Sequence, residues 1–118
     1  MKKILILSMA LLFIMATAVA AEEWTYLGTY WTTGYDLCWR CCGKTDGITA
    51  SGTYATVGRT CAAPKNLPFG ARLYIEGVGY RIVEDRGGAI RGNKIDVLCA
   101  NHSACYAITG WRNVWVIK

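Results

Sequence analysis

The chain is organised around one stretch, Val83-Glu84-Asp85-Arg86-Gly87-Gly88-Ala89-Ile90-Arg91-Gly92-Asn93-Lys94-Ile95-Asp96-Val97. An apolar, β-branched run ends in Glu84-Asp85, a glycine-dense connector follows, and a second strand-like run, residues 95–98, carries Asp96 in its middle. Asp is depleted in strands because its short polar side chain competes with the backbone ladder for hydrogen bonds. Asp96, placed between Ile95 and Val97, therefore needs an explanation.

The glycines of this stretch predict backbone that turns with positive φ or closely approaches another group. Two carboxylates, Asp85 and Asp96, would then face each other across a compact loop, which is a spacing that acid–base chemistry on a sugar bond can use. The structural alternative is an Asp85 that caps a turn and an Asp96 that is exposed on an edge strand.

Residues 1–21 have the pattern of a secretory signal. Lys2 and Lys3 supply the positive region, residues 4–15 the apolar region, and Ala18-Val19-Ala20 or Val19-Ala20-Ala21 the cleavage site. A retained membrane anchor is the rival interpretation, since the apolar stretch approaches spanning length. We favour cleavage because the stretch ends in small residues rather than in a charged flank. The expected product is secreted to the cell envelope, without a membrane segment.

The remaining residues, 22–118, suit one domain with one modest core. The formal net charge of +5 falls to +3 without Lys2 and Lys3, and the basic residues are spread along the chain. A nucleic-acid-binding protein would show a denser basic stripe, so we expect no nucleic-acid partner. The charge predicts at most a weak attraction to an anionic wall polymer.

All six cysteines follow the signal: Cys38, Cys41, Cys42, Cys61, Cys99 and Cys105. An even number in a short exported chain predicts a disulfide framework, with fifteen connectivities open if all six pair. Cys99 and Cys105 are close enough in sequence to pair locally, which would leave Cys61 for one of the other three. A zinc site at Cys38-x-x-Cys41-Cys42 with His102 is the rival, and we disfavour it because a second metal-spaced pair is missing. We therefore expect no metal and no cofactor.

Most of the chain has the pattern of short strands. Residues 24–35 are rich in Thr, Tyr and Trp, residues 71–76 and 80–84 flank the tight turn Gly77-Val78-Gly79, and residues 111–117 close the chain. A short helix is expected over residues 103–109, with Ser103 near its N-cap and Gly110 after its end. The stretch Gly47–Thr53, in which glycines flank small hydroxylated residues, is either a plain turn or a shallow wall that lets a polymer come close. The pattern predicts a small, mainly β barrel with one or two short helices.

Residues 83–97 resemble the signature of the three-aspartate (3D) domain family, which groups with the catalytic domain of membrane-bound lytic transglycosylase A. Three further blocks resemble the same family in order: residues 41–53, the Leu67-Pro68-Phe69-Gly70-Ala71 block with Leu73-Tyr74-Ile75, and the ending Gly110 to Lys118. The resemblance covers nearly the whole mature chain. It implies a six-stranded double-psi β-barrel with a groove across one face.

The resemblance also implies bacterial peptidoglycan as the partner, and a role for individual residues. Asp96 matches the family's catalytic acid, and Asp85 matches its second aspartate. The first aspartate is absent, because Ala63 stands at its place. The implied substrate-binding residues are Thr49, Ser51, Gly52, Thr53, Gly87, Gly88 and Lys94. Cys99 and Cys105 replace residues that are usually aromatic or small in the family, which favours an additional local disulfide.

The preferred function is a lytic transglycosylase, expected to act as a monomer, that cleaves the β-1,4 bond between MurNAc and GlcNAc and leaves a 1,6-anhydro end. Asp96, protonated in an apolar setting, would be the acid, and Asp85 would stabilise the positive charge that develops on the sugar. Glu84 is a weaker candidate, because strand alternation points it away from Asp85.

Two alternatives remain. One is an inverting hydrolase in which Asp36, in a Thr33-Gly34-Tyr35-Asp36 element similar to that of barrel-type endoglucanases, activates water opposite Asp96. The other is a non-catalytic wall-binding or wall-loosening barrel, similar to expansins or barwin. In such a barrel the sugar rings of the bound polymer would stack on aromatic side chains, for which the candidates are Tyr30, Trp31, Tyr35 and Trp39.

Overall fold

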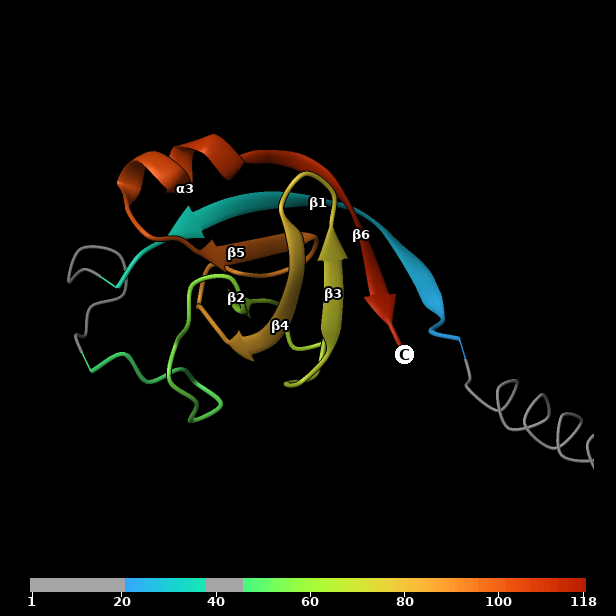
Figure 1. Cartoon of the computed structure of the whole chain (residues 1–118), viewed down its shortest axis with the longest axis horizontal. Helices are drawn as coiled ribbons and strands as arrows, with labels where there is room; N and C mark the ends of the chain where they lie inside the picture. The colour runs from blue at the N-terminus through green and yellow to red at the C-terminus, as the bar shows by residue number, and fades with distance from the viewer. Residues whose placement is uncertain (1–20, 38–45) are drawn as a thin grey trace, which may run out of the picture.

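The computed structural model describes residues 21–37 and 46–118, in which six strands close into a barrel (Figure 1). The strands are β1 (Trp24–Tyr35), β2 (Thr60–Ala62), β3 (Arg72–Ile75), β4 (Gly79–Asp85), β5 (Lys94–Leu98) and β6 (Gly110–Ile117). Around the barrel they follow the order β1-β5-β2-β4-β3-β6. The pairs β1/β5 and β2/β4 are parallel and the other four pairs are antiparallel. The predicted six-stranded double-psi barrel is confirmed.

The barrel encloses one apolar core, because alternate residues of each strand point inward. Its fully buried members include Leu73 and Ile75 from β3, Val83 from β4, Ile95 from β5 and Val114 from β6, all 0% exposed. Residues between them in sequence, such as Tyr74 and Asp96, therefore point to the outside of the barrel wall.

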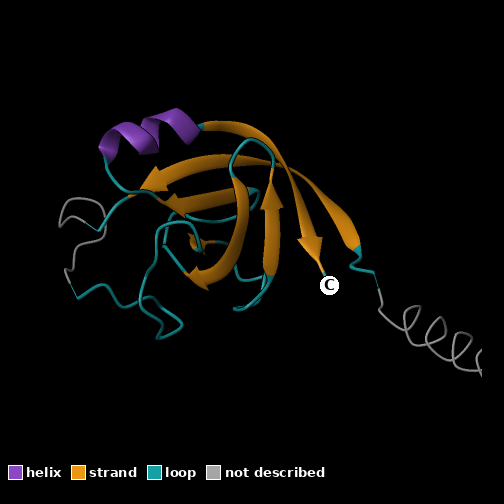
Figure 2. Cartoon of the chain, viewed as in Figure 1, coloured by secondary structure: helices purple, strands orange, loops and turns teal. Residues whose placement is uncertain are grey.

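The described residues contain a single helix, α3 (His102–Ile108), which lies across the end of the barrel beside β1 (Figures 1 and 2). Its N-cap is Asn101, whose side-chain oxygen accepts a hydrogen bond from the Ala104 amide at 2.9 Å. The helix therefore begins one residue before Ser103, the expected N-cap. Within residues 21–37 and 46–118, no helix has the length and apolar character needed to cross a bilayer.

The first and the last residues of the barrel lie side by side. Glu23 and Lys118 exchange both backbone hydrogen bonds, at 3.1 and 2.9 Å, so that the start of β1 and the end of β6 are tied together. The predicted signal, residues 1–21, lies outside the described residues except for Ala21, and it stays a prediction.

The predicted disulfides are not found among the described cysteines, where Cys61, Cys99 and Cys105 are free and buried. Cys61 belongs to the barrel core, where it packs as a small apolar side chain and its thiol donates to the Ile82 carbonyl oxygen at 3.6 Å. Cys99 and Cys105 are not joined covalently, and the Cys99 thiol donates to the Val97 carbonyl oxygen at 3.2 Å. Cys38, Cys41 and Cys42 lie outside the described residues.

Candidate functional site

Strand register brings the two central carboxylates together. Asp96 of β5 pairs with Thr33 of β1 on one side and with Ala62 of β2 on the other. Ala62 in turn pairs with Asp85 of β4. Asp85 and Asp96 therefore lie on either side of one small residue, Ala62.

The Asp96 carboxyl lies on the outer face of the barrel, because its neighbours Ile95 and Val97 fill the core. The Thr33 hydroxyl donates a hydrogen bond to its Oδ1 at 2.9 Å. Partial burial raises the pKa of Asp96, the hydrogen bond from Thr33 opposes the rise, and the negative charge of Asp85 adds to it. This carboxyl consequently holds its proton to a higher pH than an ordinary aspartate.

A β-bulge turns Asp85 towards the same face. The β2–β4 register shifts between Cys61, which pairs with Val83, and Ala62, which pairs with Asp85, so that Glu84 is the additional residue. Bulges of this kind re-aim side chains next to functional sites. Strand alternation alone would have sent Asp85 and Val83 to the same side.

Three donors hold the Asp85 carboxylate. The Tyr35 hydroxyl donates to Oδ2 at 3.0 Å, and the backbone amides of Ala50 and Arg86 each donate to Oδ1 at 2.9 Å. Burial and the adjacent Asp85 charge raise the pKa of Tyr35 far above its ordinary value, so the phenol remains a donor. Asp85 is thereby fixed in orientation from β1, from the 49–53 loop and from its own backbone.

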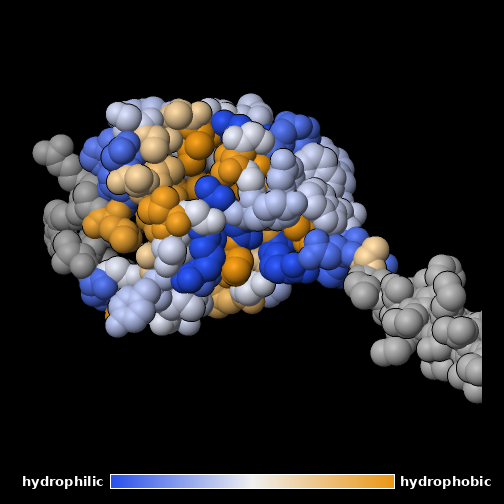
Figure 3. Space-filling model, viewed as in Figure 1, coloured by the Kyte–Doolittle hydropathy of each residue, from blue (hydrophilic) through white to orange (hydrophobic). Residues whose placement is uncertain are grey.

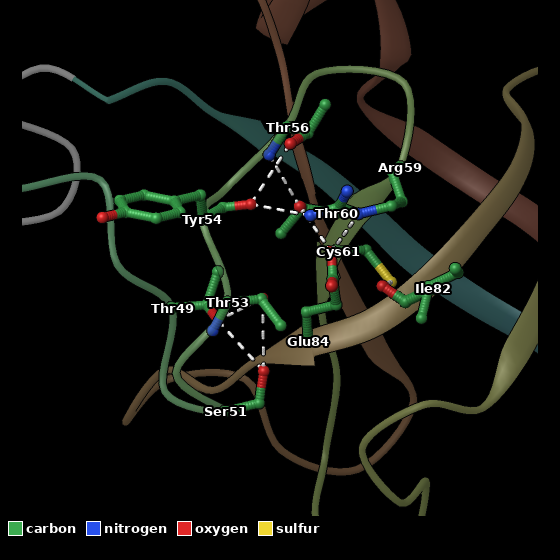
Figure 4. A network of polar contacts seen from close by, with 10 residues as sticks. All are labelled: Thr49, Ser51, Thr53, Tyr54, Thr56, Arg59, Thr60, Cys61, Ile82 and Glu84. Carbon is green, nitrogen blue, oxygen red and sulfur yellow. Dashed lines mark hydrogen bonds and ion pairs between the residues drawn. The ribbon is translucent and has the colours of Figure 1, made fainter.

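Glu84, the weaker acid candidate, is engaged in a separate network (Figure 4). Its Oε1 accepts hydrogen bonds from Arg59 Nε at 2.9 Å and from the Thr60 hydroxyl at 2.8 Å, and the residue is 7% exposed. Burial by itself pushes the pKa of Glu84 up, but hydrogen bonds from Arg59, Thr60 and Thr53 outweigh it and the net pKa is lowered. Glu84 is therefore an ionised structural group rather than a proton donor.

The predicted polar wall, residues 49–53, is a turn that docks on the end of β4. The Thr49 hydroxyl contacts those of Ser51 at 3.0 Å and Thr53 at 2.8 Å, and the Ser51 amide donates to the Glu84 carbonyl oxygen at 3.0 Å. Gly52 has a φ of +91°, which a residue with a side chain rarely adopts. Thr49 is buried, whereas Ser51 and Thr53 keep accessible surface beside Asp85.

The glycine-dense connector lines an open cleft of about 620 Å³, whose wall begins at Arg86, the residue after Asp85. Gly87, Gly88 and Gly92 form one side of the cleft, with Lys65 and Arg91 supplying positive charge. Ile90, also in its wall, packs on the small cluster of Tyr35, Ala62 and Leu98 that lies between the two aspartates. The structure therefore places Gly87 and Gly88 in the wall of a cleft that begins one residue after Asp85.

Lys94 belongs to a different part of the same face. It pairs with Trp31 of β1, and Trp31 pairs with Trp111 of β6, whose ring contacts that of Trp31 at a centroid distance of 5.5 Å. Trp111 is 67% exposed. Lys94 precedes Asp96 by two residues on β5. The row formed by Lys94, Trp31 and Trp111 therefore lies about 7 Å along the outer face of the barrel from Asp96.

Other candidates do not take the roles predicted for them. The Asp36 carboxylate is paired with Nε2 of His102, the first residue of α3, at 3.0 Å. Tyr30 and Tyr35, proposed as stacking platforms, are only 4% and 7% exposed and cannot offer their ring faces. Trp39 lies outside the described residues. Ala63, at the position of the missing aspartate, is 0% exposed and part of the barrel core.

The sequence did not identify Thr33 and Tyr35 as the residues that hold the two carboxylates. Their signal is the alternation Trp31-x-Thr33-x-Tyr35 at the end of a strand, which places all three on one face. The parallel pairing with β5, which makes that face the one of Asp96, has no local signature.

Comparisons with known proteins agree with this fold. A profile of the 3D domain matches residues 59–118. YabE of Bacillus subtilis (strain 168), provisionally named a cell wall shaping protein, is 46% identical over 50 residues, which cover 42% of this chain and 12% of YabE. YocH of the same organism, named a cell wall-binding protein, is 37% identical over 65 residues, which cover 52% of this chain and 23% of YocH.

A crystal structure of MltA from E. coli matches with a TM-score of 0.51 at 23% identity, over 60% of this chain and 27% of MltA. That likeness concerns the fold. The chain spans less than a quarter of the length of the two curated relatives.

Proposed function

Because the chain belongs to the 3D domain family, we propose that it acts on bacterial peptidoglycan at the cell envelope as a lytic transglycosylase. The observation that carries this proposal is the pair of aspartates on one outer face of the barrel, in which the partly buried Asp96 has a raised pKa and Asp85 is fixed by three donors. The names of the relatives, cell wall shaping and cell wall-binding, support the same polymer.

The reaction needs one acid that works twice. Asp96 donates its proton to the glycosidic oxygen as the bond to C1 breaks, leaving a positively charged, oxocarbenium-like sugar. The resulting Asp96 carboxylate then takes the proton from the C6 hydroxyl of the same sugar, whose oxygen attacks C1 and closes the 1,6-anhydro ring. No water enters, and Asp96 ends in the protonated state in which it began.

Asp85 supports both steps electrostatically. Its negative charge favours the protonated form of Asp96 before cleavage and the cationic sugar afterwards. Thr33 keeps the Asp96 carboxyl in one orientation throughout. Ser51 and Thr53 on one side, and the Gly87-Gly88 backbone on the other, are the proposed contacts to sugar hydroxyl and amide groups.

Product analysis tests the reaction. After digestion of purified peptidoglycan in ¹⁸O water, mass spectrometry should show anhydro ends without label. Asp96→Asn, which cannot deliver a proton, should lower the cleavage rate by about 10²–10⁴-fold. Labelled reducing ends in place of anhydro ends would show a hydrolase and contradict the proposal.

Asp36→Asn is the matched control for the alternative hydrolase. Because Asp36 is engaged with His102, we expect this variant to retain cleavage. Loss of cleavage in Asp36→Asn together with ¹⁸O incorporation would assign the reaction to an Asp36–Asp96 pair instead.

A further inference from the structure

A row of aromatic side chains crosses four strands on the barrel wall opposite to Asp96. Tyr26 of β1 pairs with Trp115 of β6, Trp115 pairs with Tyr74 of β3, and Tyr74 pairs with Tyr80 of β4. Together with Trp24, which contacts three of these rings, we call this set the aromatic ladder. In the closed strand order β3 lies across the barrel from β5, so the aromatic ladder and Asp96 face opposite directions.

The aromatic ladder is a surface rather than part of the core. Tyr74 alternates with Leu73 and Ile75, which fill the barrel, and therefore points outward. Trp24, Tyr26 and Tyr80 are 43%, 54% and 59% exposed. The rings contact one another at centroid distances of 5.1 to 6.5 Å, which makes them one continuous patch. Contiguous exposed patches of this kind mark interaction sites.

An arginine-lined cleft of about 420 Å³ borders the aromatic ladder. Arg59, Arg72 and Arg81 line it, and Tyr80 belongs both to the cleft and to the aromatic ladder. Arg72 sits two residues before Tyr74 on β3, about 7 Å along the strand, so the cleft directly adjoins the aromatic row. Figure 3 shows strongly hydrophilic residues gathered around an apolar spot in the middle of the face where β3 and β4 lie in Figure 1.

The charges of this cleft are not balanced. Arg72 is paired with Glu22 at 3.0 Å and Arg59 with Glu84 at 2.9 Å. Arg81 has no ion pair among the described residues, and its Nε is buried there without a hydrogen-bond acceptor. Arg81 Nη1 donates to the Tyr80 carbonyl oxygen at 2.7 Å, so its positive charge is held at the cleft without a carboxylate partner in the described part of the chain, and an anionic ligand would balance that charge. The cleft therefore fits a carboxylate or another planar anion.

We propose that the aromatic ladder and the arginine-lined cleft form a second, non-catalytic binding site for a peptidoglycan strand. The apolar faces of consecutive sugar rings would lie on Tyr and Trp side chains, which combine apolar ring faces with polar edges. The row spans three interstrand spacings, about 14 Å, which accommodates a short run of sugars. A stem-peptide carboxylate would occupy the cleft. The identity of this polymer rests on the proposed function, whereas the two-part surface does not.

Two polymer sites on opposite walls have a consequence for catalysis. A chain held at the aromatic ladder keeps the opposite face close to neighbouring strands of the wall and raises their effective concentration there. The second site should therefore matter for insoluble wall and not for short soluble fragments.

A sedimentation assay with insoluble peptidoglycan, stripped of phosphodiester polymers, tests the site. The full chain carrying Asp96→Asn is used so that binding is measured without cleavage. Adding Tyr26→Ala and Tyr80→Ala should weaken binding by about tenfold. Tyr106→Ala, which removes a tyrosine that is 80% exposed on α3, is the matched control and should bind as its parent does. Trp24→Ala provides an independent ladder variant if the double variant has a lowered melting temperature.

A second arm tests the charge. Arg72→Gln should weaken sedimentation with peptidoglycan several-fold but leave binding to chitin, which has sugar rings and no carboxylates, unchanged. Unaltered sedimentation of the ladder variants would overturn the proposal, as would binding that requires phosphodiester polymers. A dimer that the same substitutions dissociate would assign the surface to a second copy of the chain instead.

The proposed reaction and the proposed second binding site can be tested independently of each other. Ladder substitutions in the otherwise unaltered chain should reduce release from insoluble wall while leaving cleavage of short soluble glycan fragments intact. Sedimentation without any cleavage product would contradict only the proposed reaction, and cleavage without ladder-dependent sedimentation only the second site.

Discussion

At the scale of single residues, the properties of Asp96 follow from opposing influences on one carboxyl. Burial and the nearby Asp85 disfavour its charged form, while the Thr33 hydroxyl favours it. The net effect is a raised pKa, which is what an acid that must carry a proton near neutral pH requires. The same effect means that Asp96 destabilises the fold whenever it is charged.

The pH dependence of stability tests this reasoning. Since the pKa of Asp96 is higher in the folded than in the unfolded state, the folded state binds more protons between the two values, and stability falls as pH rises through that window. Asp96→Asn, which keeps an oxygen for Thr33, should therefore be more stable than the wild type at pH 7. Its advantage should vanish below the ordinary aspartate pKa. Urea unfolding at pH 3 and pH 7 measures it, with the exposed Glu23→Gln as a control for lost charge. An advantage of Asp96→Asn at pH 3 that disappears at pH 7 would contradict the assignment.

Tyr35 is expected to position Asp85 rather than to contact the sugar. Tyr35→Phe removes the hydroxyl that donates to Asp85 Oδ2 while the two backbone donors remain. Hydrogen bonds to charged groups contribute about 1.5–3 kcal/mol, so kcat should fall by roughly 10–100-fold with little change in KM. The pH profile of kcat should shift as well, since the charge beside Asp96 is displaced. Tyr30→Phe, on the same strand but in the core, should change neither kcat nor its pH profile. Equal effects of the two substitutions would refute a positioning role for Tyr35.

At the scale of elements, the site depends on how closely α3 approaches β1. Gly34 lies between Thr33 and Tyr35, and a Cβ built there would be 2.7 Å from both Cys105 Cα and Cys99 Sγ. Its φ is not in the left-handed region, so the requirement for glycine is purely steric. The residues that hold Asp96 and Asp85 are thus braced from behind by the helix.

Gly34→Ala should consequently destabilise the fold by about 1–3 kcal/mol, the usual cost of overpacking. Gly88→Ala is the matched control, because nothing lies within 4 Å of its hypothetical Cβ. Chemical denaturation distinguishes the two variants. A Gly34→Ala protein as stable as the Gly88→Ala protein would mean that α3 can move away from β1 without cost.

The elements also show how far sequence patterns reach. The first strand was predicted over the residues that form it, 24–35, because alternating Thr, Tyr and Trp leave little ambiguity. Strand β2, residues 60–62, was missed, since three wholly buried residues have neither the length nor the alternation of a recognisable strand. The bulge that turns Asp85 outward arises from the pairing of β4 with this missed strand. Asp85 and Asp96 could be named from the sequence because they stand in a recognisable local stretch. The residues that hold them could not, because pairing between distant strands has no local signature.

At the scale of the whole molecule, closure of the barrel gives two usable faces. Because every strand is paired on both sides, side chains on the outer wall are held in a fixed register around the circumference. One arc, at β5, β2 and β4, carries the paired aspartates. The aromatic ladder is centred on the opposite arc, at β6 and β3, and extends to β1 and β4 on either side. A disulfide framework was expected from the six cysteines, but no disulfide joins these two arcs among the described residues. The arcs are connected by packing in the buried core instead.

The backbone pairing of Glu23 with Lys118 holds the start of the first barrel strand beside the end of the last one. Joining these two positions through a short flexible linker would cost little entropy, since they already lie side by side. New ends cut at the exposed Val57-Gly58 turn should then give a circularly permuted protein with the same far-ultraviolet spectrum and cooperative unfolding. By the same geometry the domain can be spliced into a surface loop of an unrelated host without pulling that loop apart.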